Sequence, residues 1–132
     1  MKNKLGWSRC LTCLLIFFAL IGCSSTKNRT EERAKERVIQ FIRLMSANQI
    51  EEAEKLLSRQ LLEDESKELF LNAYDNWQLK DSSIVVQVTH ITFEDDKNIG
   101  EASIHVRNEK LGFTKIATLA IKFERGDWYI GG

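Results

Sequence analysis

The chain has 132 residues, of which 43% are hydrophobic and 29% are charged, and its 19 basic and 19 acidic residues cancel to a formal net charge of zero. This length indicates one domain, large enough to bury roughly two-thirds of the surface that its unfolded chain exposes. Because no cluster of Lys or Arg stands out, the sequence argues against nucleic acid as a partner.

The first 22 residues have the layout of a secretory signal. Three of the first nine residues are basic, no acidic residue precedes Glu31, and residues 11–21 are apolar apart from Thr12. A basic start followed by a short apolar run is typical of a leader that is removed. About eleven apolar residues are too few to cross a ~30 Å hydrocarbon core as a helix. We therefore expect a cleaved leader, and the alternative is a membrane helix that is never cut.

The tetrapeptide Leu20-Ile21-Gly22-Cys23 follows this apolar run. It resembles the lipobox of bacterial lipoproteins, in which aliphatic and small residues precede a cysteine. The resemblance implies cleavage after residue 22, attachment of diacylglycerol to the Cys23 thiol, acylation of the new N-terminus by a fatty acid such as palmitate, and a location on the bacterial cell envelope. Two or three acyl chains anchor a protein stably, whereas one chain is marginal.

Processing at this site would change the composition of the chain. Residues 23–30 would be the lipidated cysteine and a polar tether, and residues 31–132 would be the domain. Removing the leader takes away three basic residues and no acid, so the mature net charge is −3, and no cysteine besides Cys23 remains. By resemblance to enteric sorting patterns, Ser24 after the cysteine implies the outer membrane, facing the periplasm, if the host is Gram-negative.

The domain is expected to begin with helices. It has no proline, and its five glycines all lie in its last third, so strong helix breakers are missing from its first part. Apolar residues at helical spacing predict a helix over 31–45 with Thr30 as N-cap, a short helix over 49–57 with Asn48 as cap, and a third helix over 59–76.

Strands are expected in the second part. Segments rich in β-branched or alternating residues predict strands over 84–94, 99–107, 113–124 and 128–130, separated by short polar turns. Consecutive strands with short loops form an antiparallel meander. Helices that precede strands in this way favour an α+β fold over an alternating α/β fold.

Two segments of the domain carry a family resemblance. Residues 48–53 (Asn-Gln-Ile-Glu-Glu-Ala) resemble the start of the second helix of nuclear transport factor 2-like domains, and residues 124–130 (Glu-Arg-Gly-Asp-Trp-Tyr-Ile) resemble their closing hairpin. The resemblance implies a cone-shaped fold of the cystatin-like class, in which three helices pack on a curved four-stranded antiparallel sheet. Domains of this kind include isomerases, dehydratases, secretion-system subunits and non-catalytic binders.

Four aromatic residues are candidates for lining the mouth of such a cone and holding an apolar ligand: Tyr74, Trp77, Phe113 and Trp128. Plain core packing is the alternative for all four. Tyr74 could also be the oxyanion donor of an isomerase, whereas Asp75 and Asp81 are expected to serve as caps or turn residues.

The two histidines do not predict a metal site. If the first hairpin is regular, His90 faces Ser103 and His105 faces Val88, so both rings lie on one face of the sheet, but a β-bulge would change this register. A metal site usually needs three or four ligands, and no third is apparent, so we expect neither a metal nor a cofactor. No nucleophile–base set or Gly-rich phosphate loop is present either.

The sequence therefore predicts a lipid-anchored envelope protein with a non-catalytic domain that binds an envelope protein or a small apolar ligand. Two alternatives stay open, which are an isomerase- or hydrolase-type enzyme that uses the cone cavity and an assembly subunit of a secretion or conjugation apparatus.

Overall fold

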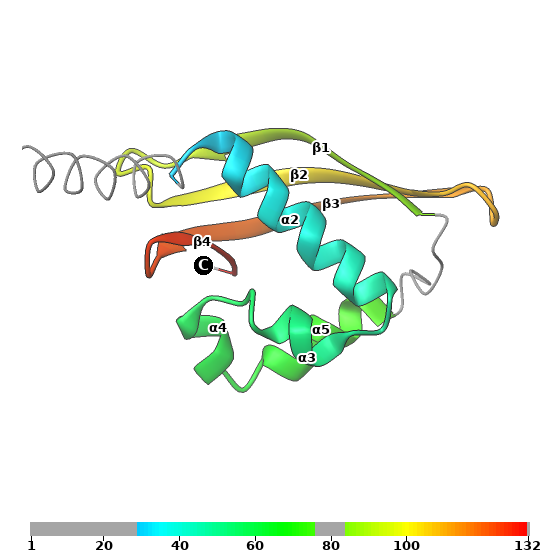
Figure 1. Ribbon diagram of the computed structural model, residues 1–132, viewed down its shortest axis with the longest axis horizontal. Helices are drawn as coiled ribbons and strands as arrows, with labels where there is room; N and C mark the ends of the chain where they lie inside the picture. The colour runs from blue at the N-terminus through cyan, green and yellow to red at the C-terminus, as the bar shows by residue number, and fades with distance from the viewer. Residues whose placement is uncertain (1–28, 76–83, 132) are drawn as a thin grey trace, which may run out of the picture.

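The computed structural model describes residues 29–75 and 84–131. The predicted leader, Cys23 and most of the tether lie outside the described residues, and so do Trp77 and Asp81. The described part is an α+β domain in which helices pack against one face of an antiparallel sheet (Figure 1).

The sheet is an open meander in the order β1-β2-β3-β4, as the sequence predicts. Its strands are β1 (Ile84–Phe93), β2 (Ile99–Asn108), β3 (Phe113–Glu124) and β4 (Asp127–Ile130). The β3–β4 turn has only Arg125 and Gly126 between the paired residues, and both have positive φ (51° and 76°). Two-residue hairpin turns favour this backbone conformation, which explains why a glycine lies there.

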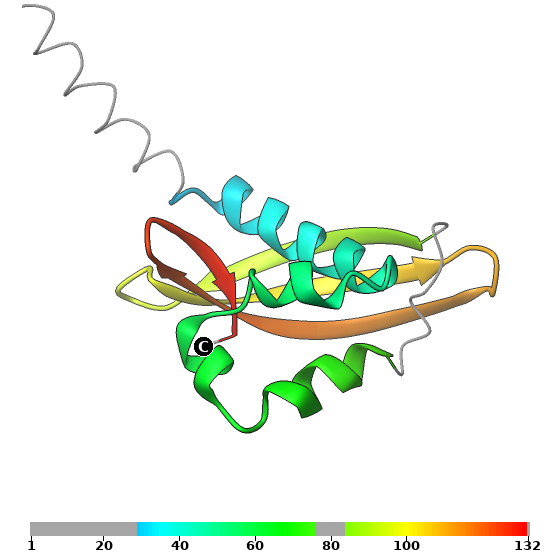
Figure 2. The same cartoon turned by 60° about the horizontal axis from the view of Figure 1, so that its bottom comes forward.

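The first helix, α2 (Glu31–Ser46), crosses the inner face of the sheet (Figures 1 and 2). The Thr30 side chain accepts a hydrogen bond from the Arg33 N–H at 3.2 Å, so the predicted N-cap is confirmed. One stripe of α2 is buried against the sheet, and it consists of Ala34, Val38, Phe41, Ile42 and Met45. This is the apolar face that the helical spacing predicts.

The predicted capping role of Asn48 is wrong. Asn48 has φ 59°, and its N–H and that of Gln49 donate to the Met45 and Leu44 carbonyls at the end of α2. Asn48 therefore terminates α2, since asparagine tolerates the left-handed conformation that helix ends often require. The next helix, α3 (Ile50–Glu54), follows Gln49, which makes no side-chain cap hydrogen bond.

Helix α3 is also shorter than predicted. Leu57 forms a parallel bridge to Ile130, and hydrogen bonds join the Ser58 N–H to the Ile130 carbonyl and the Ile130 N–H to the Leu56 carbonyl. The backbone at 56–58 thus pairs with the last strand, and this tertiary pairing ends the helix.

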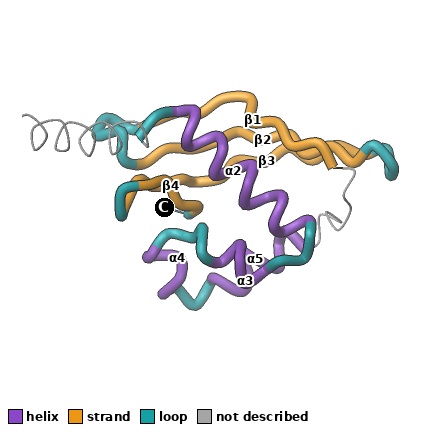
Figure 3. Tube along the Cα trace, in the orientation of Figure 1, coloured by secondary structure: helices purple, strands orange, loops and turns teal. Residues whose placement is uncertain are grey.

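The predicted third helix is two helices, α4 (Arg59–Glu63) and α5 (Lys67–Asp75), so the helix count was wrong. Asp64 is extended, with ψ 138°, and its side chain accepts a hydrogen bond from the Ser66 N–H at 2.8 Å. Asp and Ser compete with helical hydrogen bonds in this way, which breaks the helix between α4 and α5. Figure 3 shows both helices beside the β4 edge of the sheet.

The β1–β2 register shifts once. His90 pairs with Ser103 as predicted, but His105 pairs with Gln87 and not with Val88, because the register shifts between Val88 and His90. Thr89 is the extra residue, and its hydroxyl donates to the Ser103 carbonyl at 3.2 Å. Both histidines still lie on the outer face of the sheet, as the sequence predicts.

Candidate functional site

Trp128 lies in a buried aromatic cluster. It is 1% exposed, and its ring lies 5.3 Å from the rings of both Phe93 and Phe123. The indole Nε1 is buried and has no hydrogen-bond partner in the part of the chain that the structure describes. The predicted burial of Trp128 is confirmed, and its role in binding a ligand stays a prediction.

Tyr74 lies in a second aromatic cluster. It is 5% exposed, and its ring contacts Phe41 and Phe70 at centroid distances of 5.3 and 5.2 Å. Burial raises the pKa of the Tyr74 phenol well above its usual range. Phe113 lies at the far end of β3, opposite Asn108. Of the candidate ligand residues, the three that are described thus occupy different parts of the domain.

Four surface cavities formed by the described residues have volumes of about 490, 410, 190 and 250 Å³. Tyr74, Phe113 and Trp128 line none of the four. The inner face of the sheet is instead filled by buried side chains such as Ile104, Leu119 and Ile121. These four cavities, which lie outside the core, are therefore the candidate binding surfaces among the described residues.

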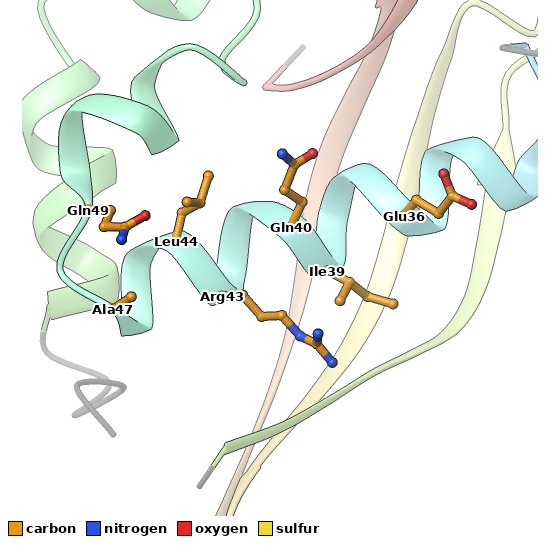
Figure 4. A pocket seen from close by; sticks show the side chains of 7 residues that line it. All are labelled: Glu36, Ile39, Gln40, Arg43, Leu44, Ala47 and Gln49. Carbon is orange, nitrogen blue, oxygen red and sulfur yellow. The ribbon is translucent and has the colours of Figure 1, made fainter. Parts of the chain in front are cut away.

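The largest of these four cavities runs along the outer side of α2, and we call it the α2 groove (Figure 4). Its volume of about 490 Å³ falls in the range of small-molecule sites. It is lined by Glu36, Ile39, Gln40, Arg43, Leu44, Ala47 and Gln49. Figure 4 shows Ile39 and Arg43 leaving the helix on one side and Gln40 and Leu44 on the other.

The residues of the α2 groove form a second face of the helix. The lining residues from Glu36 to Leu44 recur at intervals of three and four, so they share one broad face of α2. This face points away from the stripe that packs on the sheet, and Figure 4 shows side chains along both of its margins. Ile39, Leu44 and Ala47 supply apolar surface, and Arg43 is an exposed cation. No hydrogen bond or ion pair of the Arg43 side chain is found within the described residues. The apolar spacing of residues 31–45 indicates the buried stripe, so this second face was not among the predicted sites.

A partly buried ionic cluster lies between α2 and the closing hairpin. The Asp127 carboxylate accepts two hydrogen bonds from Arg33, at 3.0 and 2.8 Å, and a third from Arg37. Burial alone would raise the pKa of Asp127, but the hydrogen bonds from Arg33, from the Trp128 N–H and from Arg37 outweigh it and hold the pKa below its usual range. The two arginines are one helical turn apart, so the cluster joins α2 to β4.

Tyr129 extends this cluster toward the solvent. The Arg37 and Arg125 guanidinium groups lie over its ring, with 5.8 and 3.9 Å between the guanidinium carbon and the ring centroid. Arg125 also bonds to Glu124, whose carboxylate accepts from the Arg59 N–H. These arginines are already paired, so the cluster is better explained by stability than by binding an anion.

His90 is exposed and His105 is half-buried, and both lie apart from these features. The His90 ring is hydrogen-bonded to the Thr92 hydroxyl at 3.0 Å, and His105 lines the cavity of about 190 Å³ on the outer face of the sheet. Within residues 29–75 and 84–131, no group of three or more His, Cys, Asp or Glu side chains could hold a metal ion. No helix among these residues is long and apolar enough to span a bilayer.

Comparisons of the chain with protein-family models, with curated proteins and with solved structures give no match.

Proposed function

We propose that this protein is a lipid-anchored protein of the bacterial cell envelope, whose domain binds a protein partner through the α2 groove. The anchoring part of the proposal is supported by the apolar leader that ends in Leu20-Ile21-Gly22-Cys23. The binding part is supported by one observation, which is that the α2 groove is open and combines apolar residues with Arg43, whose side chain has no partner within residues 29–75 and 84–131.

The shape of the groove favours a protein segment over a small ligand. Small-molecule sites usually bury about 70–90% of the surface of a drug-sized ligand. The α2 groove instead follows one side of a helix from Glu36 to Ala47, a length of about 16 Å at the helical rise. A segment of this length with apolar side chains at helical spacing fits such a surface. An acidic side chain on the partner would pair with Arg43.

Lipid anchoring is tested by the substitution Cys23→Ser. Cells that express the wild type or the variant are grown with a labelled fatty acid, and incorporation into the protein is followed on a gel. The wild type should carry the label, and the variant should remain an unlabelled precursor, because diacylglycerol attaches to the Cys23 thiol. Equal labelling of both proteins would refute the anchoring part of the proposal.

Partner binding is tested by photocrosslinking in cells. A photoreactive residue replaces Gln40 in the groove or, as a matched control, Thr118 on the exposed outer face of the sheet. We expect a discrete adduct from position 40 and none from position 118. The adduct should disappear when Ile39→Glu is added, because a carboxylate then occupies the apolar part of the groove. An adduct that survives Ile39→Glu would refute binding through the groove.

An assembly subunit is the second candidate, and the outer face of the sheet favours it. Ile116 is 71% exposed and Val85 is 42% exposed, and both lie on this face. A filled core combined with exposed apolar residues on a sheet is typical of a surface that packs on another subunit. Adducts from position 118 with none from position 40 would favour this candidate over the α2 groove.

A further inference from the structure

The described chain enters the domain at one end of the sheet. The Arg29 guanidinium donates a hydrogen bond to Asn98 Oδ1, and its central carbon lies 5.2 Å from the centre of the Phe123 ring. Asn98 belongs to the β1–β2 turn, and Phe123 lies next to the β3–β4 turn. We call this the tether end, and it consists of residues 94–98 and 124–127.

The β2–β3 turn lies at the opposite end of the sheet, which we call the distal end and which consists of residues 108–112. Figures 1 and 2 show this turn at the far right of the sheet, while the β1–β2 and β3–β4 turns and the start of α2 lie at the left. Strand β2 has 10 residues. At about 3.3 Å per residue it separates the two ends by about 30 Å.

The chain between Cys23 and Arg29 is shorter than this separation. Six residues span at most about 20–22 Å when they are fully extended. As a flexible polar segment they would span about 12–15 Å. A lipid on Cys23 can therefore reach a bilayer that lies against the tether end. It cannot reach one that lies against the distal end, because the chain would have to cover the length of the sheet as well.

We propose that the tether end is the surface that this protein turns toward the lipid headgroups, and that the distal end points away from the bilayer. This inference rests on the proposed anchor at Cys23. It places the β1–β2 and β3–β4 turns next to the membrane and leaves the β2–β3 turn free in the compartment that the protein faces.

The tether, and not an affinity for lipid, sets this orientation. The β1–β2 turn carries three acidic residues (Glu94, Asp95, Asp96) and one basic residue, Lys97, so it has no basic patch that would attract anionic headgroups. Of the exposed large apolar residues in the described part of the chain, Leu69 lies on α5. The other three, Val85, Leu111 and Ile116, lie toward the distal end, where they are available to a protein and not to the bilayer.

The test measures which backbone amides lie near the headgroups. All core side chains lie between Ala34 and Ile130, so residues 23–132 contain the complete described fold. Cys23 is the only cysteine in that stretch, and a maleimide lipid therefore couples to it alone. The ¹⁵N-labelled, coupled domain is placed on lipid nanodiscs that carry a gadolinium-chelating headgroup, and the intensity of each amide signal is compared with that on diamagnetic nanodiscs.

We expect loss of amide signal at residues 95–98 and 125–126 and retained signal at residues 109–112. Moving the anchor, with Cys23→Ser and Lys110→Cys together, should reverse the pattern. The uncoupled Cys23→Ser domain should keep all its signals on nanodiscs that contain anionic lipid. Equal loss at both ends, or greater loss at residues 109–112 in the Cys23-coupled domain, would overturn the inference.

This experiment separates the orientation from the anchoring itself. Chemical coupling supplies the lipid, so the amide pattern does not depend on processing in cells, which the fatty-acid labelling of Cys23→Ser tests. An equal loss at both ends would leave lipidation standing and reject the orientation alone.

Discussion

Trp128 is the side chain whose removal should destabilise the domain most clearly. It is 1% exposed and contacts the rings of Phe93 and Phe123. A buried aromatic side chain of this kind covers about 150–250 Å², and truncation to alanine typically costs about 3–5 kcal/mol. We therefore expect Trp128→Ala to lose about 3–5 kcal/mol of a domain stability of about 5–15 kcal/mol.

Urea unfolding of the soluble domain, starting at residue 27, measures this loss. With a denaturant slope of about 1–3 kcal/mol per molar for a small domain, the midpoint should fall by at least about 1 M. A midpoint equal to that of the wild type would refute the reasoning, because it would mean that Trp128 is exposed and that the closing hairpin does not pack as the structure has it.

The matched control is Trp128→Phe. This variant keeps a ring between Phe93 and Phe123, and it removes the buried Nε1 donor that has no partner among the described residues. Because an unsatisfied buried donor costs about 1–3 kcal/mol, its removal offsets part of the lost packing. We expect Trp128→Phe to cost about 1 kcal/mol or less, and a loss as large as that of Trp128→Ala would show that the indole donor is satisfied.

Three further predictions concern the ionic cluster, the N-cap and the histidines. Asp127→Asn should cost about 3 kcal/mol at pH 7, because it leaves Arg33 and Arg37 without their counter-ion in a partly buried site. Since the folded-state pKa of Asp127 lies below its unfolded value, this stabilisation is complete above the unfolded pKa of about 3.9 and is lost as the pH falls through the folded value. Urea midpoints of wild type and variant should thus converge as the pH falls below about 4, and a constant difference would contradict the assignment. Thr30→Ala should cost about 1 kcal/mol through loss of the N-cap, measured in the same assay. Replacing His90 and His105 together with Gln should change the stability by less than about 0.5 kcal/mol and leave complementation of a deletion strain intact, since both lie on the outer face of the sheet and neither packs in the core. Loss of complementation by a stable double variant would favour an enzyme.

Local sequence chemistry determined much of the fold. Thr30, two acidic residues and an apolar stripe at helical spacing are enough to start and orient α2, because capping and amphipathicity act within one or two turns. The strand order of the meander is also determined locally, because a short polar turn places each strand antiparallel to the next one along the chain. In the closing hairpin, Trp128 and Ile130 are buried and Tyr129 between them is half-buried, as the alternation of side chains along a strand requires.

Tertiary contacts decided what the local pattern left open. Asn48 can cap a helix or terminate one, and the turn from α2 into α3 selects the second role. Pairing of residues 56–58 with Ile130 ends α3, and a residue from the far end of the chain cannot be anticipated from the helix itself. The bulge at Thr89 shifts the partner of His105 by one residue for the same reason, since register depends on both strands.

The surfaces proposed for function also depend on packing between distant segments. The sequence shows that α2 has apolar residues on its second side, but only the packing of the first side on the sheet leaves Ile39 and Arg43 facing outward. The proposed leader and the proposed lipidation of Cys23, in contrast, rest on sequence alone, because such a signal is a short linear pattern. Which end of the domain that lipid would hold near a bilayer follows from the contact of Arg29 with Asn98, a contact between residues 69 positions apart that only the folded chain brings together.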